Sequence, residues 1–262
     1  MRFEGSLQRR LWGDLPAGFQ VICRSRTQVM VARQGWERYF NPEEFLGPGG
    51  SLQDASPYCG RGELGLLRLK NGENALVRPY HHGGLLRHLT GDFFFTWPPR
   101  PFRELAATEE ARRRGVPTVE ILGALVKRAC GPLYRGWLVT RELSGAEDLW
   151  SALQGDACGA RGNPPLLRVV AQGIKRMHRR GVYHRDLHLK NILVRREGRE
   201  IQSYLIDFDK AQLFSAAVPQ HKAWRNLKRL YRSVRKLDPE RRHLTEEDWR
   251  LFLRFYQEAF EE

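Results

Sequence analysis

The stretch from Tyr183 to Lys210 constrains the fold of this chain more than any other part of the sequence. It contains the run His184-Arg185-Asp186-Leu187, then Asn191, and later Asp207-Phe208-Asp209. The apolar runs at 192–194 and 204–206 predict two short strands, because short apolar runs bounded by polar residues are typical of strands. Two such strands return the chain to its starting point. The stretch therefore predicts one polar centre that contains Asp186, Asn191 and Asp207.

The spacing within this stretch is that of a kinase catalytic loop, H-R-D-L-x-x-x-N followed by a strand and a D-F-x turn. A short loop can direct Asp186 at a substrate hydroxyl, so that this carboxylate accepts or orients the proton. Asn191 and Asp207 can then hold Mg²⁺ bound to the phosphates of ATP. The alternative, a hairpin with incidental surface acids, is less favoured because residue types and flanking elements agree.

The chain as a whole has the composition of a globular protein, with 262 residues, of which 41% are hydrophobic. No apolar run approaches the length needed to span a bilayer, and no signal peptide is visible at the N-terminus. The four cysteines lack C-x-x-C spacing, which favours a reducing cytoplasm over a disulfide framework or a zinc site. The formal net charge of +14 suits phosphorylated ligands, anionic lipid head groups or nucleic acid, and does not choose among them.

We expect an α+β, protein-kinase-like fold with two lobes. Residues 1–57 are interpreted as an N-terminal extension packed on the N-lobe. Residues 58–143 form a small, β-rich N-lobe, and residues 144–262 a compact helical C-lobe that carries the catalytic loop and basic C-terminal helices.

Candidate nucleotide-binding residues lie in the predicted N-lobe. Gly60, Arg61 and Gly62 precede a hairpin that turns at Asn71-Gly72, so these glycines could cover the phosphates of ATP, although a plain loop is also possible. Arg78 ends the second strand, where kinases place a phosphate-binding lysine. Arginine and lysine are not interchangeable, and a solvated edge-strand arginine is the alternative.

A helix expected from Pro101 to Arg114 lies where a kinase needs an acid to orient the strand cation. We assign that role to Glu104 and expect Glu109 and Glu110 on a solvated face. Glu142 falls in an expected hinge between the lobes, where backbone groups could meet adenine.

Lys190, four residues after Asp186, could neutralise charge on the transferring group or could be solvated. The segment after Asp209 is short and lacks an Ala-Pro-Glu signature, so it offers no platform for a peptide substrate. The helix at 224–236 combines an apolar stripe with six cations. This pattern fits either a solvated face or a surface for an anionic acceptor or a charged membrane.

These residues together resemble the lipopolysaccharide-core kinases, the family that includes the kinases of 3-deoxy-D-manno-octulosonic acid (Kdo). The resemblance covers roughly residues 58–238 and rests on the catalytic loop together with the runs Gly60-Arg61-Gly62, Phe102-Arg103-Glu104, Gly115-Val116-Pro117, Leu205–Asp209 and Trp224-Arg225-Asn226-Leu227. It implies a protein-kinase-like fold. It also implies transfer of phosphate from Mg-ATP to a sugar hydroxyl of a Kdo-lipid A precursor, by a peripheral enzyme on the cytoplasmic face of the inner membrane.

The chain departs from this family at positions that could contact the acceptor. His81 and His82 stand where the family usually has arginines, and Arg185 and His188 where it usually has a small residue and Asn. A heptose kinase of the same superfamily therefore stays open as an alternative. So do a small atypical protein kinase and a pseudokinase that binds membrane or, less readily, nucleic acid. The sequence does not indicate an oligomeric state.

Overall fold

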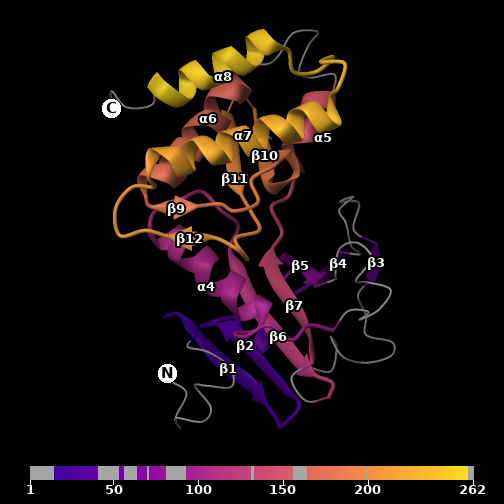
Figure 1. Ribbon diagram of the computed structural model, residues 1–262. Helices are drawn as coiled ribbons and strands as arrows, with labels where there is room; N and C mark the ends of the chain where they lie inside the picture. The colour runs from indigo at the N-terminus through magenta and orange to yellow at the C-terminus, as the bar shows by residue number, and fades with distance from the viewer. Residues whose placement is uncertain are drawn as a thin grey trace. The chain divides into compact units, whose positions relative to one another are not determined.

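The computed structural model describes residues 15–40, 53–55, 64–69, 71–80, 93–130, 133–155, 164–198 and 200–258. The chain divides into two units, Met1–Glu109 with Glu120–Glu142 and Glu110–Val119 with Leu143–Glu262 (Figure 1). The helix α4 contributes its first ten residues to the first unit and its last turn to the second.

A seven-stranded antiparallel sheet forms the first unit, with the strand order β1-β2-β6-β7-β5-β4-β3. Its strands and helices are β1 (Phe19–Arg24), β2 (Gln28–Arg33), the short 3-10 helix η1 (Glu37–Tyr39), β3 (Gln53–Ala55), β4 (Gly65–Arg68), β5 (Asn74–Pro79), α4 (Arg100–Arg113), β6 (Ile121–Arg128) and β7 (Tyr134–Arg141). The predicted hairpin around Asn71-Gly72 is present as β4 and β5, and Gly72 occupies the left-handed conformation that its turn requires, with φ of 83°.

Residues 19–33 differ from the extension that we expected on the N-lobe, because they form strands inside its sheet. β2 hydrogen-bonds to β6 inside the sheet and is buried along most of its length. Its successive side chains alternate between the two faces, with Val29 and Val31 in one core cluster and Met30 and Ala32 in the other. A strand buried on both faces lacks the alternating pattern that identifies a strand by sequence alone.

The helix α4 covers one face of this sheet. Phe102 and Leu105 pack into the same cluster as Val29 and Val31. The helix ends at Gly115, whose φ of 78° permits the left-handed closing turn, and the amide of Val116 donates to the carbonyl of Ala111. Burial of Phe102 and Leu105 therefore fixes which face of α4, and which of its acids, turns toward the sheet.

Helices dominate the second unit, as the sequence predicted. Its elements are β8 (Ala146–Asp148), α5 (Leu149–Gln154), α6 (Pro164–Arg179), β9 (Val182–Tyr183), the 3-10 helix η3 (Leu189–Asn191), β10 (Ile192–Glu197), β11 (Glu200–Leu205), β12 (Gln212–Leu213), α7 (Gln220–Leu237) and α8 (Glu246–Glu258). β11, β10 and β8 form a three-stranded sheet, and β12 pairs with β9. The two strands expected after Asn191 are β10 and β11, paired from Ile192–Leu205 to Glu197–Glu200.

A buried chain of hydrogen bonds links α8, α6 and α7. His178 Nδ1 lies 2.8 Å from the hydroxyl of Tyr256, and His178 Nε2 lies 2.9 Å from Asn226 Oδ1. The Asn226 amide nitrogen donates to the carbonyl of His184 at 2.6 Å, so its oxygen must accept from His178. His178 Nε2 therefore carries a proton, and Tyr256 donates to Nδ1 when the ring is neutral. This chain ties the helical core to the start of the catalytic loop.

The pKa of His178 falls from 6.5 to about 4, chiefly because burial disfavours the charged imidazolium. The unfolded chain binds a proton on this residue near pH 6.5, whereas the folded protein binds it only near pH 4. Neutral His178 therefore makes its full contribution to the free energy of unfolding above pH 6.5. This contribution decreases as the pH falls toward 4, by about 3 kcal/mol in all.

We predict that His178→Gln removes this part of the pH dependence. Denaturant titrations from pH 7.5 to 4 should show a shallower loss of unfolding free energy in the variant than in the wild type. His221→Gln, at an exposed position at the start of α7, is the control and should retain the wild-type slope. Identical slopes for the wild type and His178→Gln would contradict a buried neutral histidine.

Candidate active site

The catalytic loop between β9 and β10 is organised around the imidazole of His184. The amide of Asp186 donates to His184 Nδ1 at 3.1 Å, so the ring proton lies on Nε2, which donates to the carbonyl of Ile206 at 2.8 Å. Burial of the ring lowers the pKa of His184, which keeps the ring neutral. This one side chain therefore joins the backbone at Asp186 to the backbone just before Asp207.

Asn191 holds the loop from its other end. Its side-chain nitrogen donates to the carbonyl of Asp186 at 2.9 Å, and its own carbonyl accepts from the amide of Ile206 at 3.0 Å. These bonds orient the side-chain amide, so that Oδ1 is the atom left available to a ligand. Asn191 is buried, whereas Asp186 is exposed to solvent.

Asp207 follows β11 directly and adopts a left-handed backbone conformation, with φ of 68°. Non-glycine residues pay a conformational cost there, and such residues occur often at functional sites. The next residue, Phe208, is fully buried and packs against His184 with ring centroids 5.1 Å apart. The structure thus brings together the backbones of Asp186, Asn191 and Asp207, the three residues that the sequence placed at one centre.

The oxygen atoms at this centre fit a magnesium ion bound to nucleotide phosphates. Mg²⁺ is usually held by one or two carboxylates, together with water and substrate phosphates. Asp207 supplies a carboxylate and Asn191 supplies Oδ1. Among the described residues, no group of three or more His, Cys, Asp or Glu side chains could hold a metal. At a site of this kind, water and the phosphates of a nucleotide would complete the coordination.

Helix α7 supports the catalytic loop at two points. Asn226 bonds to the carbonyl of His184, and Ser233 Oγ accepts from the amide of Leu189 at 3.2 Å. In the sequence, Asn226 stood out only as part of the run that begins at Trp224, and its contact with the catalytic loop was not predicted. A signal was present, because Asn226 is a polar residue inside the apolar stripe of an amphipathic helix, between Ala223 and Leu230.

In the first unit, Arg78 and Glu104 lie together. Arg78 Nη2 is 2.5 Å from Glu104 Oε1, and the hydroxyl of Tyr80 donates to Glu104 Oε2. The Glu104 side chain is 3% exposed and that of Arg78 is 35% exposed. Both oxygens of a buried carboxylate are thus occupied, and the Arg78 side chain stays partly exposed to solvent. Tyr80 is a buried part of this cluster.

The remaining predicted site residues include Glu142, Lys190 and the run 60–62. Glu142 ends the first unit, where its amide donates to the carbonyl of Asn74 and its carboxylate accepts from the Asn74 side chain at 2.8 Å. Its side chain is thereby engaged by β5. Gly60, Arg61 and Gly62 lie outside the described residues, as do His81 and His82. Lys190, one residue before Asn191, is exposed to solvent.

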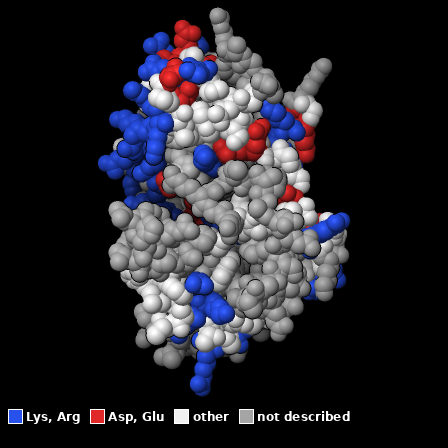
Figure 2. Space-filling view, turned by 90° about the vertical axis from the view of Figure 1, so that its right-hand side faces the viewer, with Lys and Arg blue, Asp and Glu red and all other residues white. Residues whose placement is uncertain are grey.

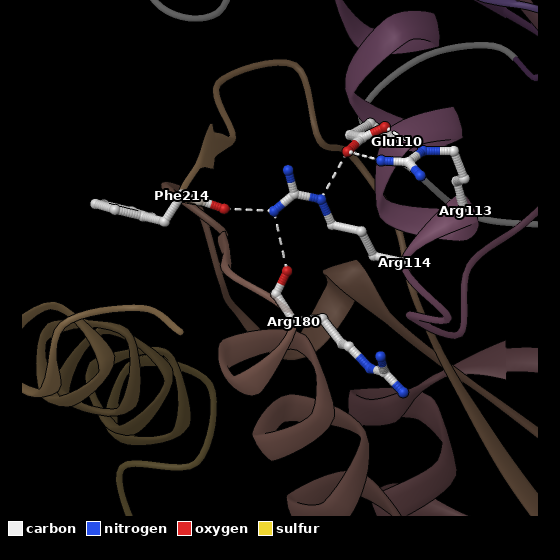
Figure 3. A network of polar contacts seen from close by, with 5 residues as sticks. All are labelled: Glu110, Arg113, Arg114, Arg180 and Phe214. Carbon is white, nitrogen blue, oxygen red and sulfur yellow. Dashed lines mark hydrogen bonds and ion pairs between the residues drawn. The ribbon is translucent and has the colours of Figure 1, made fainter. Parts of the chain in front are cut away.

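A cluster around Arg114 stabilises the segment that follows Asp207 (Figure 3). Arg114 Nη1 donates to the carbonyls of Phe214 at 2.6 Å and Arg180 at 3.1 Å, and Arg114 Nε donates to Glu110 at 2.7 Å. Hydrogen bonds from Arg113 and Arg114 lower the pKa of Glu110 to about 2. Glu110 is partly exposed, as expected of a solvated face, and it also has a structural role through its two arginine partners.

The backbone of the same segment is bound along its length. Phe214 donates to the carbonyl of Gly181, and Val218 donates to the carbonyl of His178. Gly181 has φ of 72°, and a Cβ atom there would lie 2.4 Å from the carbonyl oxygen of Ala216. The segment between Asp207 and α7 is thus held against α6 and β9, and only glycine fits at the point of closest approach.

A cavity of about 530 Å³ lies elsewhere in the second unit. Its lining includes Lys175, His178, Val218, Trp224 and Tyr256. Asp186, Asn191 and Asp207 do not line it. This cavity is therefore separate from the candidate phosphotransfer centre, although both share the hydrogen-bond chain through His178.

Comparisons with known proteins agree on the family. The model of the lipopolysaccharide kinase (Kdo/WaaP) family matches residues 60–256. A 3-deoxy-D-manno-octulosonic acid kinase of Pasteurella multocida is 31% identical over 76% of this chain and 82% of its own length. The enzymes of the same name from Actinobacillus succinogenes and Vibrio cholerae are 31% and 33% identical, over 86% and 75% of this chain and 92% and 78% of their own lengths.

A solved structure shows the same fold. The chain matches the structure described as "WaaP in complex with acyl carrier protein" with a TM-score of 0.55 and 21% sequence identity, over 87% of this chain and 88% of that one. The prediction of an α+β, protein-kinase-like fold is therefore confirmed, as is the family resemblance. By its sequence, this chain belongs to the lipopolysaccharide kinase (Kdo/WaaP) family.

Proposed function

We propose that this protein transfers the γ-phosphoryl group of ATP to a hydroxyl of a Kdo residue on a lipopolysaccharide precursor such as Kdo-lipid A. The observation that carries the proposal is the geometry at Asn191. Its nitrogen is fixed on the backbone of Asp186, and its oxygen is left for a ligand beside Asp207. A loop that aligns one exposed carboxylate with two metal-binding oxygens suits phosphoryl transfer to an alcohol.

In this mechanism the second unit supplies the residues that act in phosphoryl transfer. Asp186 accepts or orients the proton of the attacking sugar hydroxyl, and Lys190 offsets charge on the transferring group. Asn191 and Asp207 would hold a magnesium ion, which would supply positive charge to offset that of the phosphates. Because positioning and electrostatics supply most of the catalysis in phosphoryl transfer, the rigidity of the loop around His184 is part of the mechanism.

The first unit would supply the contacts to the nucleotide. Arg78, fixed by Glu104 and partly exposed to solvent, binds phosphate oxygens in place of the lysine used by protein kinases. Gly60, Arg61 and Gly62 cover the phosphates. Backbone groups around Glu142 meet the adenine, since the Glu142 side chain itself is engaged by Asn74.

The structure of the segment after Asp207 favours a sugar acceptor over a protein acceptor. This segment is held by Arg114, Gly181 and His178, and α7 begins at Gln220. It leaves little chain to form a peptide-binding platform. The relatives reported above are Kdo kinases, which favours Kdo over heptose as the acceptor. The retained Asp186, Asn191 and Asp207 argue against a pseudokinase.

We expect Asp186→Asn to lower kcat for phosphate transfer to Kdo-lipid A by about 1,000-fold, because the hydroxyl proton loses its acceptor. The Michaelis constant for ATP should change little. Arg78→Lys should instead raise the Michaelis constant for ATP about tenfold, since a bidentate contact to phosphate is lost. Both quantities come from transfer of labelled γ-phosphate from Mg-ATP, with the melting temperature as a check of folding.

Heptosylated core and a generic protein serve as competing acceptors in this assay. Label on heptosylated core alone would move the acceptor from Kdo to heptose and leave the mechanism intact. An intact Asp186→Asn variant with wild-type kcat would contradict the assigned role of Asp186. An intact wild type that does not bind ATP would refute the proposed kinase activity.

We further propose that the protein acts peripherally on the anionic cytoplasmic face of the inner membrane, where a lipid-anchored acceptor would be found. Among the described residues, no helix is long and apolar enough to cross a membrane. Lysine and arginine side chains gather along the left-hand edge of the upper half of Figure 2. On α7, the exposed cations are Arg225, Lys228, Arg232, Arg235 and Lys236.

Binding to vesicles tests this second proposal. Each Lys or Arg near an anionic surface contributes about 1 kcal/mol. Changing Lys228, Arg232 and Arg235 together to glutamine should therefore weaken binding to phosphatidylglycerol vesicles roughly 100-fold. High salt should weaken wild-type binding, and phosphatidylcholine vesicles should bind neither protein. Equal binding of wild type and triple variant to anionic vesicles would exclude α7 as the membrane-binding surface.

A further inference from the structure

Arg229 lies on the face of α7 that supports the catalytic loop. Residues three, four and seven positions apart share one face of a helix, so Arg229 falls between Asn226 and Ser233. Asn226 bonds to the carbonyl of His184, and Ser233 accepts from the amide of Leu189. These two contacts bracket Asp186. Arg229 is consequently about one helical turn from each of the points at which α7 meets the catalytic loop.

One nitrogen of the Arg229 guanidinium, Nη1, is shielded from solvent without a hydrogen bond to a described residue. Arg229 is partly buried, whereas the neighbouring cations Arg225, Lys228 and Arg232 are exposed and can be hydrated. Leaving a guanidinium N–H shielded and unpaired costs free energy, so such a group usually marks an ordered water, an ion or a ligand that completes it.

Arg229 Nη1 has no hydrogen-bond partner among the described residues, so this edge of the guanidinium is left for an incoming anion. A carboxylate suits a guanidinium best, because two parallel N–H···O bonds match the planar fork. The proposed acceptor is a sugar acid and carries a carboxylate close to its hydroxyl groups. That negative charge would approach the carboxylate of Asp186, and a cation beside the loop would offset the repulsion between them.

We propose that Arg229 binds the carboxylate of the acceptor sugar and thereby sets the specificity for a sugar acid; this inference rests on the function proposed above. Arg229 is then a specificity residue rather than part of the phosphotransfer machinery. A neutral sugar such as a heptose would leave its guanidinium unpaired, and discrimination would follow from that penalty.

The test pairs a variant with a modified acceptor. Wild type, Arg229→Gln and the control Arg254→Gln are each assayed with a detergent-solubilised Kdo-lipid A and with its analogue in which the Kdo carboxyl is reduced to an alcohol. Arg254 lies on α8 and is exposed. Its variant makes the same change in charge, and the use of detergent micelles removes effects of vesicle binding.

For the native acceptor, Arg229→Gln should lower kcat/KM about 30-fold, mainly through the Michaelis constant of the acceptor, with that of ATP unchanged. For the wild type, kcat/KM should fall by a similar factor when the native acceptor is replaced by the reduced one. For Arg229→Gln, the same replacement should lower kcat/KM little further, because the variant has already lost the contact to the carboxylate. Arg229→Lys should lie between the two. The melting temperature of Arg229→Gln should equal or exceed that of the wild type, since its Nη1 hydrogen-bonds to no described residue.

Other outcomes overturn the inference. Additive losses would show that Arg229 and the carboxylate act independently. A higher Michaelis constant for ATP with an unchanged constant for the acceptor would assign the guanidinium to the nucleotide phosphates. A lower melting temperature with no change in specificity would show a structural role. If the wild type transfers no phosphate to either acceptor, the proposed function fails. Calorimetry then measures the affinities of wild type and Arg229→Gln for the two acceptors without catalysis. Equal affinities of the two proteins for the native acceptor refute the proposed contact.

Discussion

The neutral imidazole of His184 is the interaction on which the candidate active site depends. It accepts from the amide of Asp186 through one nitrogen and donates to the carbonyl of Ile206 through the other. Only a neutral histidine can do both. Burial lowers the pKa of His184 and so keeps it neutral, and the packing of Phe208 on its ring adds to that burial. The residues proposed as base and as metal ligand thus have their backbones tied to one side chain.

The support of this side chain extends through the second unit. Asn226 holds the carbonyl of His184, His178 holds Asn226, and Tyr256 holds His178. Three helices therefore contribute to the position of one loop, and every polar group named in this chain is hydrogen-bonded, as a buried network requires. Arg114 restrains the segment beyond Asp207 in a similar way. The second unit is consequently a rigid support for a short catalytic loop. One of the supporting helices, α7, also carries exposed cations on its solvent-facing side.

Local patterns predicted those parts of the structure that depend on local physics. The loop at Asp186, the strands that return to Asp207, the hairpin at Asn71-Gly72 and the long helices follow from spacing and periodicity. Contacts between residues far apart in the sequence could not be predicted from local patterns. β2 joins the sheet through its pairing with β6, far along the chain, so no local pattern placed residues 19–33 in that sheet. Arg114, Asn226 and Tyr80 act through partners far along the chain, which no window of sequence contains.

The central claim is that this chain phosphorylates the Kdo residue of a lipid acceptor. Tandem mass spectrometry of Kdo-lipid A, after incubation with the protein and Mg-ATP, tests it most directly because it locates the new phosphate. The account predicts one added phosphate on the Kdo residue and none on the lipid A backbone. An unmodified acceptor, or a phosphate only on lipid A, would contradict it.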